Sequence, residues 1–522
     1  MNMKNMSQKI LWADDEIDLL KPHIMFLEEK GFDVRTTNSG SEVAEMLEAE
    51  NFDILFLDEH MPGMSGLETL QEVKNLRPNL PVVMITKSEE ESIMENAIGS
   101  NISDYLIKPV NPNQILLSVK KNLEKKKLRS EKATMGYQQQ FMQIGSEIGG
   151  ALDFNQWKDI YKKLVYWELE LGSLEDTGIS EVFRNQKEEA NQVFSRYIEK
   201  NYIDWVSGEA EEKPVLSHTL TKDWLFPMLK NAGKPVFFIV IDNLRYDQWK
   251  VLQSVVEEYF SVESESMYYS ILPSVTQYAR NSMFAGLMPS DIQERFPKYW
   301  VAENEEGTKN QYEKDLLGEN LKRNGFNIKY SYNKVLSYNV GRRVAEKISN
   351  LVTNDLNVIV YNFIDMLSHA RTEMEVIKEL AEDESAYRSL TLSWFEHSPL
   401  RDILANLAGE DVKVVLTTDH GSVKVHNPVK IVGDRATNTN LRYKIGRSLN
   451  YNKKEVFQIK DPGEAHLPKH SLSSSFAFCR KNDFFAYPNN FNYYANYYRN
   501  TFQHGGISME ELMIPYIVLN NK

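Results

Sequence analysis

The sequence predicts a multidomain α/β protein, and three observations support that prediction. The chain has 522 residues, a length that corresponds to about three or four domains. Hydrophobic residues make up 42% and charged residues 26% of the chain, a balance typical of globular proteins that excludes collagen-like, disordered and membrane-spanning classes. Strand and helix patterns alternate at both ends of the chain, whereas the middle shows helical patterns only.

Residues 1–125 predict a parallel sheet with helices on both faces. Five strand patterns alternate with helical stretches, and parallel strands need such crossovers. The size fits a flavodoxin-like doubly wound sheet. We expect strands at Ile10–Ala13, Asp33–Thr36, Ile54–Leu57, Val82–Thr86 and Tyr105–Ile107, and helices near Glu16–Lys30, Ser41–Glu50, Gly66–Arg77, Glu91–Ile98 and Asn113–Lys126.

Residues 126–213 predict a helical bundle that links the two ends of the chain. The cationic stretch Lys120–Lys132 favours an exposed helical connector over a nucleic-acid site. Beyond it, Trp157, Tyr161 and Leu164 recur at helical spacing, which indicates an apolar stripe on one helix face. Such a bundle could couple the two ends or form a dimer surface.

Residues 214–522 predict a second, larger α/β domain. Buried strands are expected at Val236–Ile241, Val358–Phe363, Val412–Thr417 and Met513–Leu519. The stretch from Val425 to His470 is rich in Asn, Lys, Gly and Pro and has a weak pattern. We expect loops or insertions there.

Charge and cysteine content restrict the partners and the compartment. The net charge of −14 does not attract nucleic acid or anionic membrane by its overall field. Met1–Lys9 lacks the apolar core of a signal peptide, and the apolar run Pro235–Ile241 is far shorter than a membrane helix. The single cysteine, Cys479, cannot form an intramolecular disulfide, so we expect a cytoplasmic protein.

A first candidate site lies at the strand ends of the N-terminal domain. Asp14 and Asp15 follow the first strand and Asp58 follows the third. These carboxylates should meet at one sheet edge and suit Mg²⁺. Asp58 can accept a phosphoryl group as an acyl phosphate. The Thr86 hydroxyl and the Lys108 ammonium, at the ends of the fourth and fifth strands, would then bind the phosphoryl oxygens.

Residues 8–125 resemble a two-component receiver domain. The resemblance rests on the Asp14–Asp15 pair, the run D-E-H-M-P-G-M-S-G that starts at Asp58, Thr86, and the pair Lys108–Pro109. It implies phosphotransfer from a cognate histidine kinase to Asp58 and a change of surface on phosphorylation. It also implies that Tyr105 is the aromatic residue that responds to the switch.

A second set of metal-ligand residues follows the strands of the C-terminal domain. Asp242 follows the first of these strands. Asp365 and His369 follow the next and are four residues apart, so both can face one metal from a helix. Asp419 and His420 follow a third strand as an adjacent pair.

Two further residues complete a predicted two-zinc centre. His504 precedes Gly505 and Gly506, which allow close backbone approach. Thr276 lies in the first turn of a helix expected to end at Gly286, where the helix dipole favours an alkoxide and a phosphate. Zinc binds His nitrogen and carboxylate oxygen, and paired zinc ions assist in-line displacement. One ion would take Asp365, His369 and His504, and the other Asp242, Asp419, His420 and the Thr276 oxygen.

The order of these motifs resembles the alkaline phosphatase superfamily, most closely its PglZ branch, over residues 214–522. The resemblance implies the same ligand roles and makes Thr276 the nucleophile, as in phosphodiesterase-like branches, with Ser274 as a competitor for that role. Arg280, Arg245 and Arg343 are candidates for binding the substrate phosphate.

The three-part arrangement resembles the PglZ-domain response regulators of type IX secretion. This implies control of secretion and gliding, contact with a sigma factor or secretion component, and dimerisation on phosphorylation. Two functions stay open. The first is a zinc-dependent hydrolase under phosphorylation control, which acts on a phosphodiester such as a nucleotide or short oligonucleotide. The second is a regulatory binding protein whose metal domain is structural or vestigial.

Overall fold

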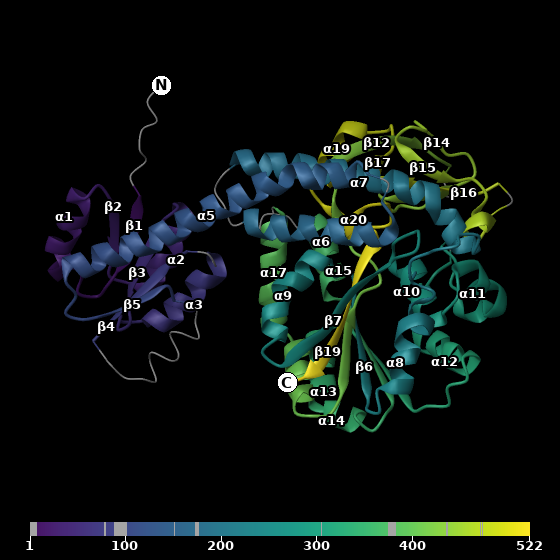
Figure 1. Cartoon of the computed structure of the whole chain (residues 1–522), viewed down its shortest axis with the longest axis horizontal. Coiled ribbons are helices and arrows are strands. Elements are labelled where there is room, and N and C mark those ends of the chain that lie inside the picture. The colour runs from purple at the N-terminus through teal and green to yellow at the C-terminus, as the bar shows by residue number, and fades with distance from the viewer. Residues whose placement is uncertain are drawn as a thin grey trace. The chain divides into compact units, whose positions relative to one another are not determined.

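The computed structural model describes residues 8–77, 80–87, 102–150, 152–172, 177–303, 305–373, 383–434, 437–469, 471 and 473–522. The described residues divide into two compact units, one up to Gln140 and the other from Phe141 onward. The division falls within one long helix, α5 (Pro112–Ile148). Figure 1 shows the order of the elements along the chain.

The N-terminal unit has the flavodoxin-like sheet that the sequence predicts. Its strands are all parallel and lie in the order β2-β1-β3-β4-β5. All five expected strands are present within a residue or two of the expected ends. The helix expected near Glu91–Ile98 lies outside the described residues, and the one expected at Asn113–Lys126 is longer, because α5 continues to Ile148. The bounds are β1 Lys9–Ala13, β2 Asp33–Thr37, β3 Ile54–Asp58, β4 Val82–Thr86, β5 Asp104–Ile107, α1 Lys21–Glu29, α2 Gly40–Ala49 and α3 Gly66–Leu76.

Alternating residues of the central strands fill two cores, one on each face of this sheet. Leu11 and Leu55 pack with residues of α2 and α3, such as Leu70, on one face. Trp12 and Phe56 pack with residues of α1 and α5 on the other. Burial on both faces explains why these strands are almost wholly apolar.

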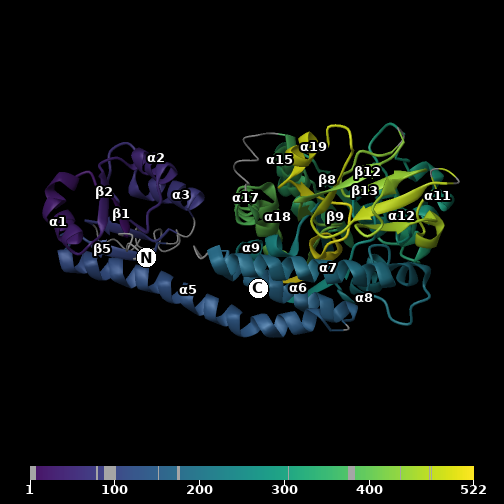
Figure 2. The same cartoon turned by 90° about the horizontal axis from the view of Figure 1, so that it is seen from above.

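The middle of the chain is helical, as predicted. After α5 come α6 (Phe154–Leu171) and α7 (Thr177–Ser207). A capping box stabilises the start of α6, since the Asp153 carboxylate accepts the N–H groups of Asn155 and Gln156. Figures 1 and 2 show α6 and α7 side by side within the C-terminal unit. None of the helices described has an apolar stretch of the length that crossing a bilayer requires.

The C-terminal unit is built on a mixed sheet of order β7-β19-β10-β6-β9-β8. Strands β10, β6, β9 and β8 are mutually parallel, and β19 is antiparallel to β10 and to β7. The four predicted strands are present, but the second ends at Tyr361 because Phe363 already begins α15. The polar alternation of β7 and the half-buried β8 concealed two strands from the sequence pattern. The bounds are β6 Val236–Ile241, β7 Phe260–Tyr269, β8 Tyr330–Val335, β9 Leu356–Tyr361, β10 Lys413–Thr417 and β19 Met513–Asn521.

The expectation of loops or insertions between Val425 and His470 holds only in part, because the stretch lies between β10 and β19 of the main sheet but contains short strands as well as loops. Short strands in this stretch pair with one another and with β16 and β17 into small sheets, and β11 pairs with β18. Strands of two to six residues whose partners lie far along the chain give little local signal. Their bounds are β11 Val423–Lys424, β12 Asn427–Val432, β13 Tyr443–Gly446, β14 Asn450–Tyr451, β15 Val456–Ile459, β16 Ser475–Cys479, β17 Asp483–Ala486 and β18 Phe502–Gln503.

Helices flank the larger sheet. Helix α10 begins at Thr276 and ends before Gly286, which has the left-handed φ of 61° that favours glycine. The helix bounds are α8 Phe226–Asn231, α9 Tyr246–Val256, α10 Thr276–Ala285, α11 Pro289–Arg295, α12 Glu313–Arg323, α13 Tyr338–Glu346, α14 Ile348–Leu351, α15 Phe363–Glu373, α17 Glu384–Glu396, α18 Pro399–Ala408, α19 Phe491–Tyr498 and α20 Met509–Leu512.

Candidate functional site

The predicted phosphoacceptor residues converge at the carboxyl edge of the N-terminal sheet. Asp14, Asp15 and Asp58 each offer an oxygen within 4.8 Å of the others. The ammonium of Lys108 lies 2.9 Å from Asp14 Oδ2 and 3.1 Å from Asp58 Oδ1. Because β1, β3, β4 and β5 are consecutive neighbours in the sheet, residues distant in sequence meet at its edge.

The electrostatics of this edge suit a divalent cation. Burial and the Asp14 carboxylate together raise the pKa of Asp58 to about 6, against the effect of Lys108. Burial lowers the pKa of Lys108, but Asp14 and Asp58 outweigh it, so the net shift is upward. Three oxygen donors with excess negative charge fit Mg²⁺, which prefers oxygen ligands.

Thr86 has a buried partner that sequence reasoning missed. Its hydroxyl donates to the carboxylate of Glu59, the residue directly after Asp58. Tyr105 lies half-buried on β5, and burial raises the pKa of its phenol. The strand positions placed both switch residues at this edge, whereas the Glu59 contact depends on a side-chain orientation that has no sequence signal.

Three adjacent parallel strands deliver the second set of predicted residues. Asp242 directly follows β6, and Asp419 and His420 lie just after β10. Asp365 lies in the first turn of α15, just after β9. The strands stand in the order β10-β6-β9, so their carboxyl ends form one continuous edge.

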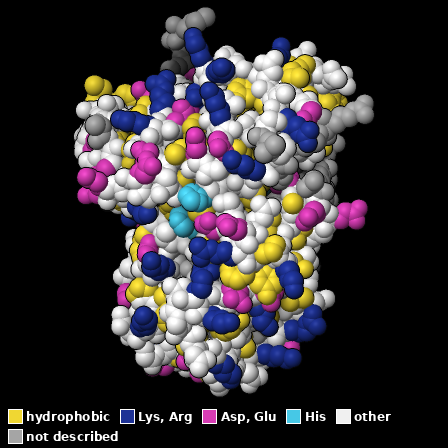
Figure 3. Space-filling view, turned by 90° about the vertical axis from the view of Figure 1, so that its right-hand side faces the viewer, with side chains coloured by type: hydrophobic (Ala, Val, Ile, Leu, Met, Phe, Trp, Pro, Cys, Tyr) yellow, Lys and Arg dark blue, Asp and Glu magenta, His cyan; other side chains and the backbone are white. Residues whose placement is uncertain are grey.

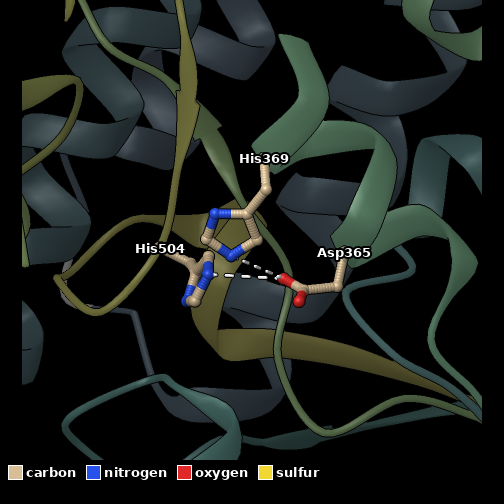
Figure 4. Close-up of side chains that lie close together, drawn as sticks. All are labelled: Asp365, His369 and His504. Atoms are coloured by element: carbon tan, nitrogen blue, oxygen red, sulfur yellow. Dashed lines mark ion pairs between the residues drawn. The ribbon is translucent and has the colours of Figure 1, made fainter. Parts of the chain in front are cut away.

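Asp365, His369 and His504 form the first ligand group. Each offers a donor atom within 4.8 Å of the others. Asp365 Oδ1 lies 3.6 Å from His369 Nε2 and 3.5 Å from His504 Nε2, and Figure 4 shows both rings directed at that oxygen. The His369 side chain is 61% exposed, and Figure 3 shows histidine side chains at the surface beside acidic ones. This group is therefore reachable from solvent.

Asp242, Asp419 and His420 form the second, fully buried group, with donor atoms within 4.8 Å of one another. The Thr276 hydroxyl lies 3.4 Å from Asp242 Oδ1 and 3.1 Å from His420 Nε2. The His420 and His504 rings stack at 4.4 Å between centroids. The structure thus brings all seven predicted residues of the second site together.

The donor atoms fit metal ions better than they fit a self-contained hydrogen-bond network. Asp365 Oδ1 and Asp419 Oδ2 are buried and accept no hydrogen bond from the described residues. The nearest donors are His369 and His504 at 3.6 and 3.5 Å from the first oxygen and Arg280 at 3.7 Å from the second, so a bound cation would satisfy both oxygens better. His420 Nδ1 lies 3.2 Å from the Gly421 carbonyl oxygen. Since a carbonyl only accepts, Nδ1 carries the proton and the Nε2 lone pair faces the site.

The pKa directions reflect crowded buried charge. Burial raises the pKa of Asp242 well above its usual value, in spite of Arg280. Burial also acts to raise the pKa values of Asp365 and Asp419. The neighbouring His504 outweighs burial at Asp365, and His420 outweighs it at Asp419, so both pKa values are lowered. Burial lowers the pKa of His420 to about 4, so its ring is neutral at pH 7.

The structure distinguishes Thr276 from the competing Ser274. Ser274 Oγ donates to the Gly506 carbonyl at 3.0 Å and accepts the Gly505 N–H at 3.2 Å. It is fully buried, whereas Thr276 is only partly so. Ser274 thus braces the loop that follows His504, and Thr276 is the hydroxyl that faces the ligand groups.

The arginines expected to bind a substrate phosphate are engaged elsewhere or lack contacts with the site. Arg245 is buried and paired with Asp247 and Glu384 at 2.5 Å each. Arg343 is exposed on α13, and no contact among the described residues joins it to the ligand groups. Arg280 lies at the site but is paired with Asp242 at 2.6 Å.

Helix α20 contacts the loops that carry His420 and His504, a role that the sequence did not reveal. Glu511 accepts the Gly506 N–H at 2.9 Å, and a Cβ on Gly421 would lie 2.1 Å from the Glu510 carbonyl oxygen. On its other side, the Glu510 carboxylate binds Lys187 of α7 at 2.9 Å. The helical middle therefore contacts the element that holds the loops of His420 and His504.

Three family descriptions match successive parts of the chain. Residues 10–120 match the response regulator receiver domain, residues 127–206 match the PorX response regulator linker domain, and residues 220–519 match the BREX system PglZ alkaline phosphatase-like domain.

Curated relatives match the receiver region. AlgB of Pseudomonas putida, an alginate biosynthesis transcriptional regulatory protein, is 33% identical over 120 residues, 23% of this chain and 27% of that protein. The transcriptional regulatory protein ResD of Bacillus subtilis is 33% identical over 113 residues, 22% of this chain and 46% of that protein. The chain thus spans under half of the length of these two relatives.

A solved receiver domain from Methanospirillum hungatei covers 23% of this chain and 96% of its own, at 28% identity and a TM-score of 0.23. The family matches extend over more of the chain, since the PglZ match alone covers more than half of it. The chain belongs to the PglZ alkaline phosphatase-like family and has the receiver, linker and PglZ architecture of a PorX-type two-component response regulator.

Proposed function

We propose that phosphorylation of Asp58 controls a zinc-dependent phosphoric ester hydrolase in the C-terminal domain. The position of Thr276 carries this proposal. Its partly exposed hydroxyl lies 3.1 Å from His420 Nε2 and 3.4 Å from Asp242 Oδ1, at a group of clustered Asp and His donors. A threonine hydroxyl needs an adjacent base or metal ion to act as a nucleophile, and the donors around Thr276 would provide these.

The residues around Thr276 have complementary tasks. His420 is neutral and presents Nε2 as an acceptor, so this atom can take a hydrogen bond from the Thr276 hydroxyl or donate its lone pair to a metal. Thr276 is the first residue of α10, whose amino end has no side-chain cap. The Tyr278 N–H is taken by the Val275 carbonyl oxygen at 3.0 Å, so the N–H groups of Thr276 and Gln277 are the ones that would be available to a phosphate oxygen.

The ligand groups would hold two zinc ions, one at Asp365, His369 and His504 and one at Asp242, Asp419 and His420. When bound, zinc would lower the pKa of the Thr276 hydroxyl and stabilise the attacking and leaving oxygens of a displacement.

A phosphodiester is the favoured substrate class. Arg245 is paired away from the ligand groups, and two of the three guanidinium nitrogens of Arg280 are paired with carboxylates, which leaves only Nη2 without a partner among the described residues. A diester carries one negative charge, so it requires less compensation than a monoester dianion. A nucleotide or short oligonucleotide fits this class, whereas the net charge of −14 disfavours a long nucleic acid.

The receiver would supply the control. Asp14, Asp15 and Asp58 would hold Mg²⁺, and a cognate histidine kinase would phosphorylate Asp58, with Lys108 and Thr86 binding the phosphoryl oxygens. We further propose cytoplasmic location, dimerisation on phosphorylation, and a role in type IX secretion and gliding through a sigma factor or secretion component. The similarity to PorX-type response regulators supports these proposals.

Two variants of one residue test the hydrolase. Thr276→Val should abolish zinc-dependent hydrolysis of bis-(p-nitrophenyl) phosphate, whereas Thr276→Ser should retain it. Asp58 phosphorylation and the melting temperature should stay unchanged in both. Undiminished turnover by Thr276→Val would refute the nucleophile assignment.

The alternative function is a regulatory binding protein with a structural or vestigial metal domain. The support of the metal-ligand loops by α20, which also contacts α7, would serve a scaffold as well as an enzyme. Metal analysis and a phosphoesterase screen separate the two functions. A protein that binds zinc but hydrolyses no ester would support the structural scaffold, and one that binds no zinc would support the vestigial one.

A further inference from the structure

Arg280 connects the buried metal-ligand group to a second buried carboxylate. It lies one helical turn after Thr276 on α10, and its side chain is fully buried. Its Nη1 is 2.6 Å from Asp242 Oδ2 and its Nε is 2.5 Å from Glu313 Oε1. Nη1 also lies 3.7 Å from Asp419 Oδ2, farther than from Asp242. The guanidinium thus connects the buried ligand carboxylates, Asp242 most closely, to a carboxylate outside both ligand groups.

Glu313 is in turn held from the opposite side. It is the first residue of α12 and is 1% exposed. Its Oε2 accepts the hydroxyl of Tyr332 and lies 3.1 Å from Lys334 Nζ, and both residues belong to β8. The charges therefore alternate in sign from the buried Asp242, Arg280 and Glu313 to the half-buried Lys334.

This chain of contacts leaves Asp242 with one oxygen for the site. Oδ2 is taken by Arg280, while Oδ1 faces Thr276 at 3.4 Å and His420 Nε2 at 3.7 Å. A carboxylate fixed in this way presents a single oxygen, and its partner fixes the orientation of that oxygen.

We propose that Arg280 and Glu313 are positioning residues that restrict Asp242 to one-oxygen ligation of the metal at the buried group. This inference rests on the proposed function of the two ligand groups, and it changes the expectation for Arg280. Its Nη1 and Nε are committed to carboxylates and only Nη2 has no partner among the described residues, so we assign it the task of orienting Asp242, and Glu313 holds Arg280 in place for that task.

Zinc titration of Glu313→Gln tests this inference, because no hydrogen bond or ion pair among the described residues joins Glu313 to the six ligand-group residues or to Thr276. The wild-type chain should bind two zinc ions. In Glu313→Gln and in Arg280→Met, the dissociation constant for one of them should rise by about 10-fold to 100-fold, the usual effect of losing a partner of a metal ligand. In the cobalt-substituted protein, the visible absorption bands should shift, since the ligation of Asp242 changes.

Glu265→Gln is a matched control. Glu265 on β7 likewise accepts a tyrosine hydroxyl and pairs with a lysine, Lys250, at 3.2 Å. This variant should melt at a lower temperature but keep the zinc affinity and cobalt spectrum of the wild type.

The outcomes separate the two levels of the proposal. If Glu313→Gln binds two zinc ions with wild-type affinity and an unchanged cobalt spectrum, the positioning role is overturned and the proposed hydrolase stands. If the wild-type chain itself binds no zinc, the proposed function is overturned together with this inference. The positioning role is decided by Glu313→Gln alone, because this variant keeps Arg280 in the chain, whereas Arg280→Met removes it.

Discussion

Replacing Asp58 by asparagine should stabilise the receiver in a pH-dependent way. Asp58 is buried beside Asp14, and these two causes raise its pKa from 3.8 to about 6. The folded state therefore binds its proton more tightly than the unfolded state does. Consequently, this group lowers the stability of the folded receiver progressively as pH rises from about 4 to about 6. An asparagine side chain at this position would carry no charge at any of these pH values.

The size of the effect follows from the shift. About two pKa units correspond to about 3 kcal/mol, and water at the carboxyl edge of the sheet screens part of this. We expect Asp58→Asn to match the wild type below about pH 4 and to exceed its free energy of unfolding by about 2 kcal/mol above about pH 7. Added Mg²⁺ should reduce the difference in free energy of unfolding. It binds the folded wild type more tightly than the folded Asp58→Asn variant and therefore stabilises the wild type more.

Urea unfolding of residues 1–140 at several pH values measures this difference. Trp12 is the only tryptophan in that stretch of the sequence and is buried against Phe56, so its fluorescence reports the unfolding of the sheet. Equal stability of the two proteins from pH 4 to pH 8 without Mg²⁺ would refute the argument that charge repulsion and burial act on Asp58.

Three further predictions concern the C-terminal unit. Lys187→Met should lower the free energy of unfolding of this unit by about 3–5 kcal/mol, because Glu168 and Glu510 lose the cation they share. Thermal unfolding measures this loss. Lys234 belongs to a more exposed ion pair, so the control variant Lys234→Met should change the free energy of unfolding little. Ser274→Ala should lower the free energy of unfolding by about 1–3 kcal/mol, since the Gly505–Gly506 loop loses its two hydrogen bonds to the Ser274 hydroxyl. The variant should retain hydrolysis. Complete loss of activity in a folded variant would shift the nucleophile assignment to Ser274. Removal of metal by a chelator should lower the melting temperature of the full chain, and zinc should restore it; a melting temperature insensitive to both treatments would argue against bound zinc.

The sequence by itself determined the fold class and the residues of both candidate sites. Apolar runs such as Val236–Ile241 mark strands buried on both faces, and the candidate site residues Asp58 and Asp242 directly follow such runs. A residue just after a parallel strand must lie at the carboxyl edge of the sheet, so the local pattern was sufficient to predict its place. The same reasoning set the Asp365–His369 pair on one face of a helix.

Only the tertiary structure decided which strands are neighbours and which buried charges meet. The order β10-β6-β9 and the pairing of the short strands after Val425 depend on contacts between distant segments. So do the hydrogen bond of Thr86 to Glu59 and the bridge of Arg280 from Asp242 to Glu313. The physical reason is range. The periodicity and the ends of a helix or strand depend on residues close in sequence. The partner of a buried charge, in contrast, is set by the packing of the whole domain.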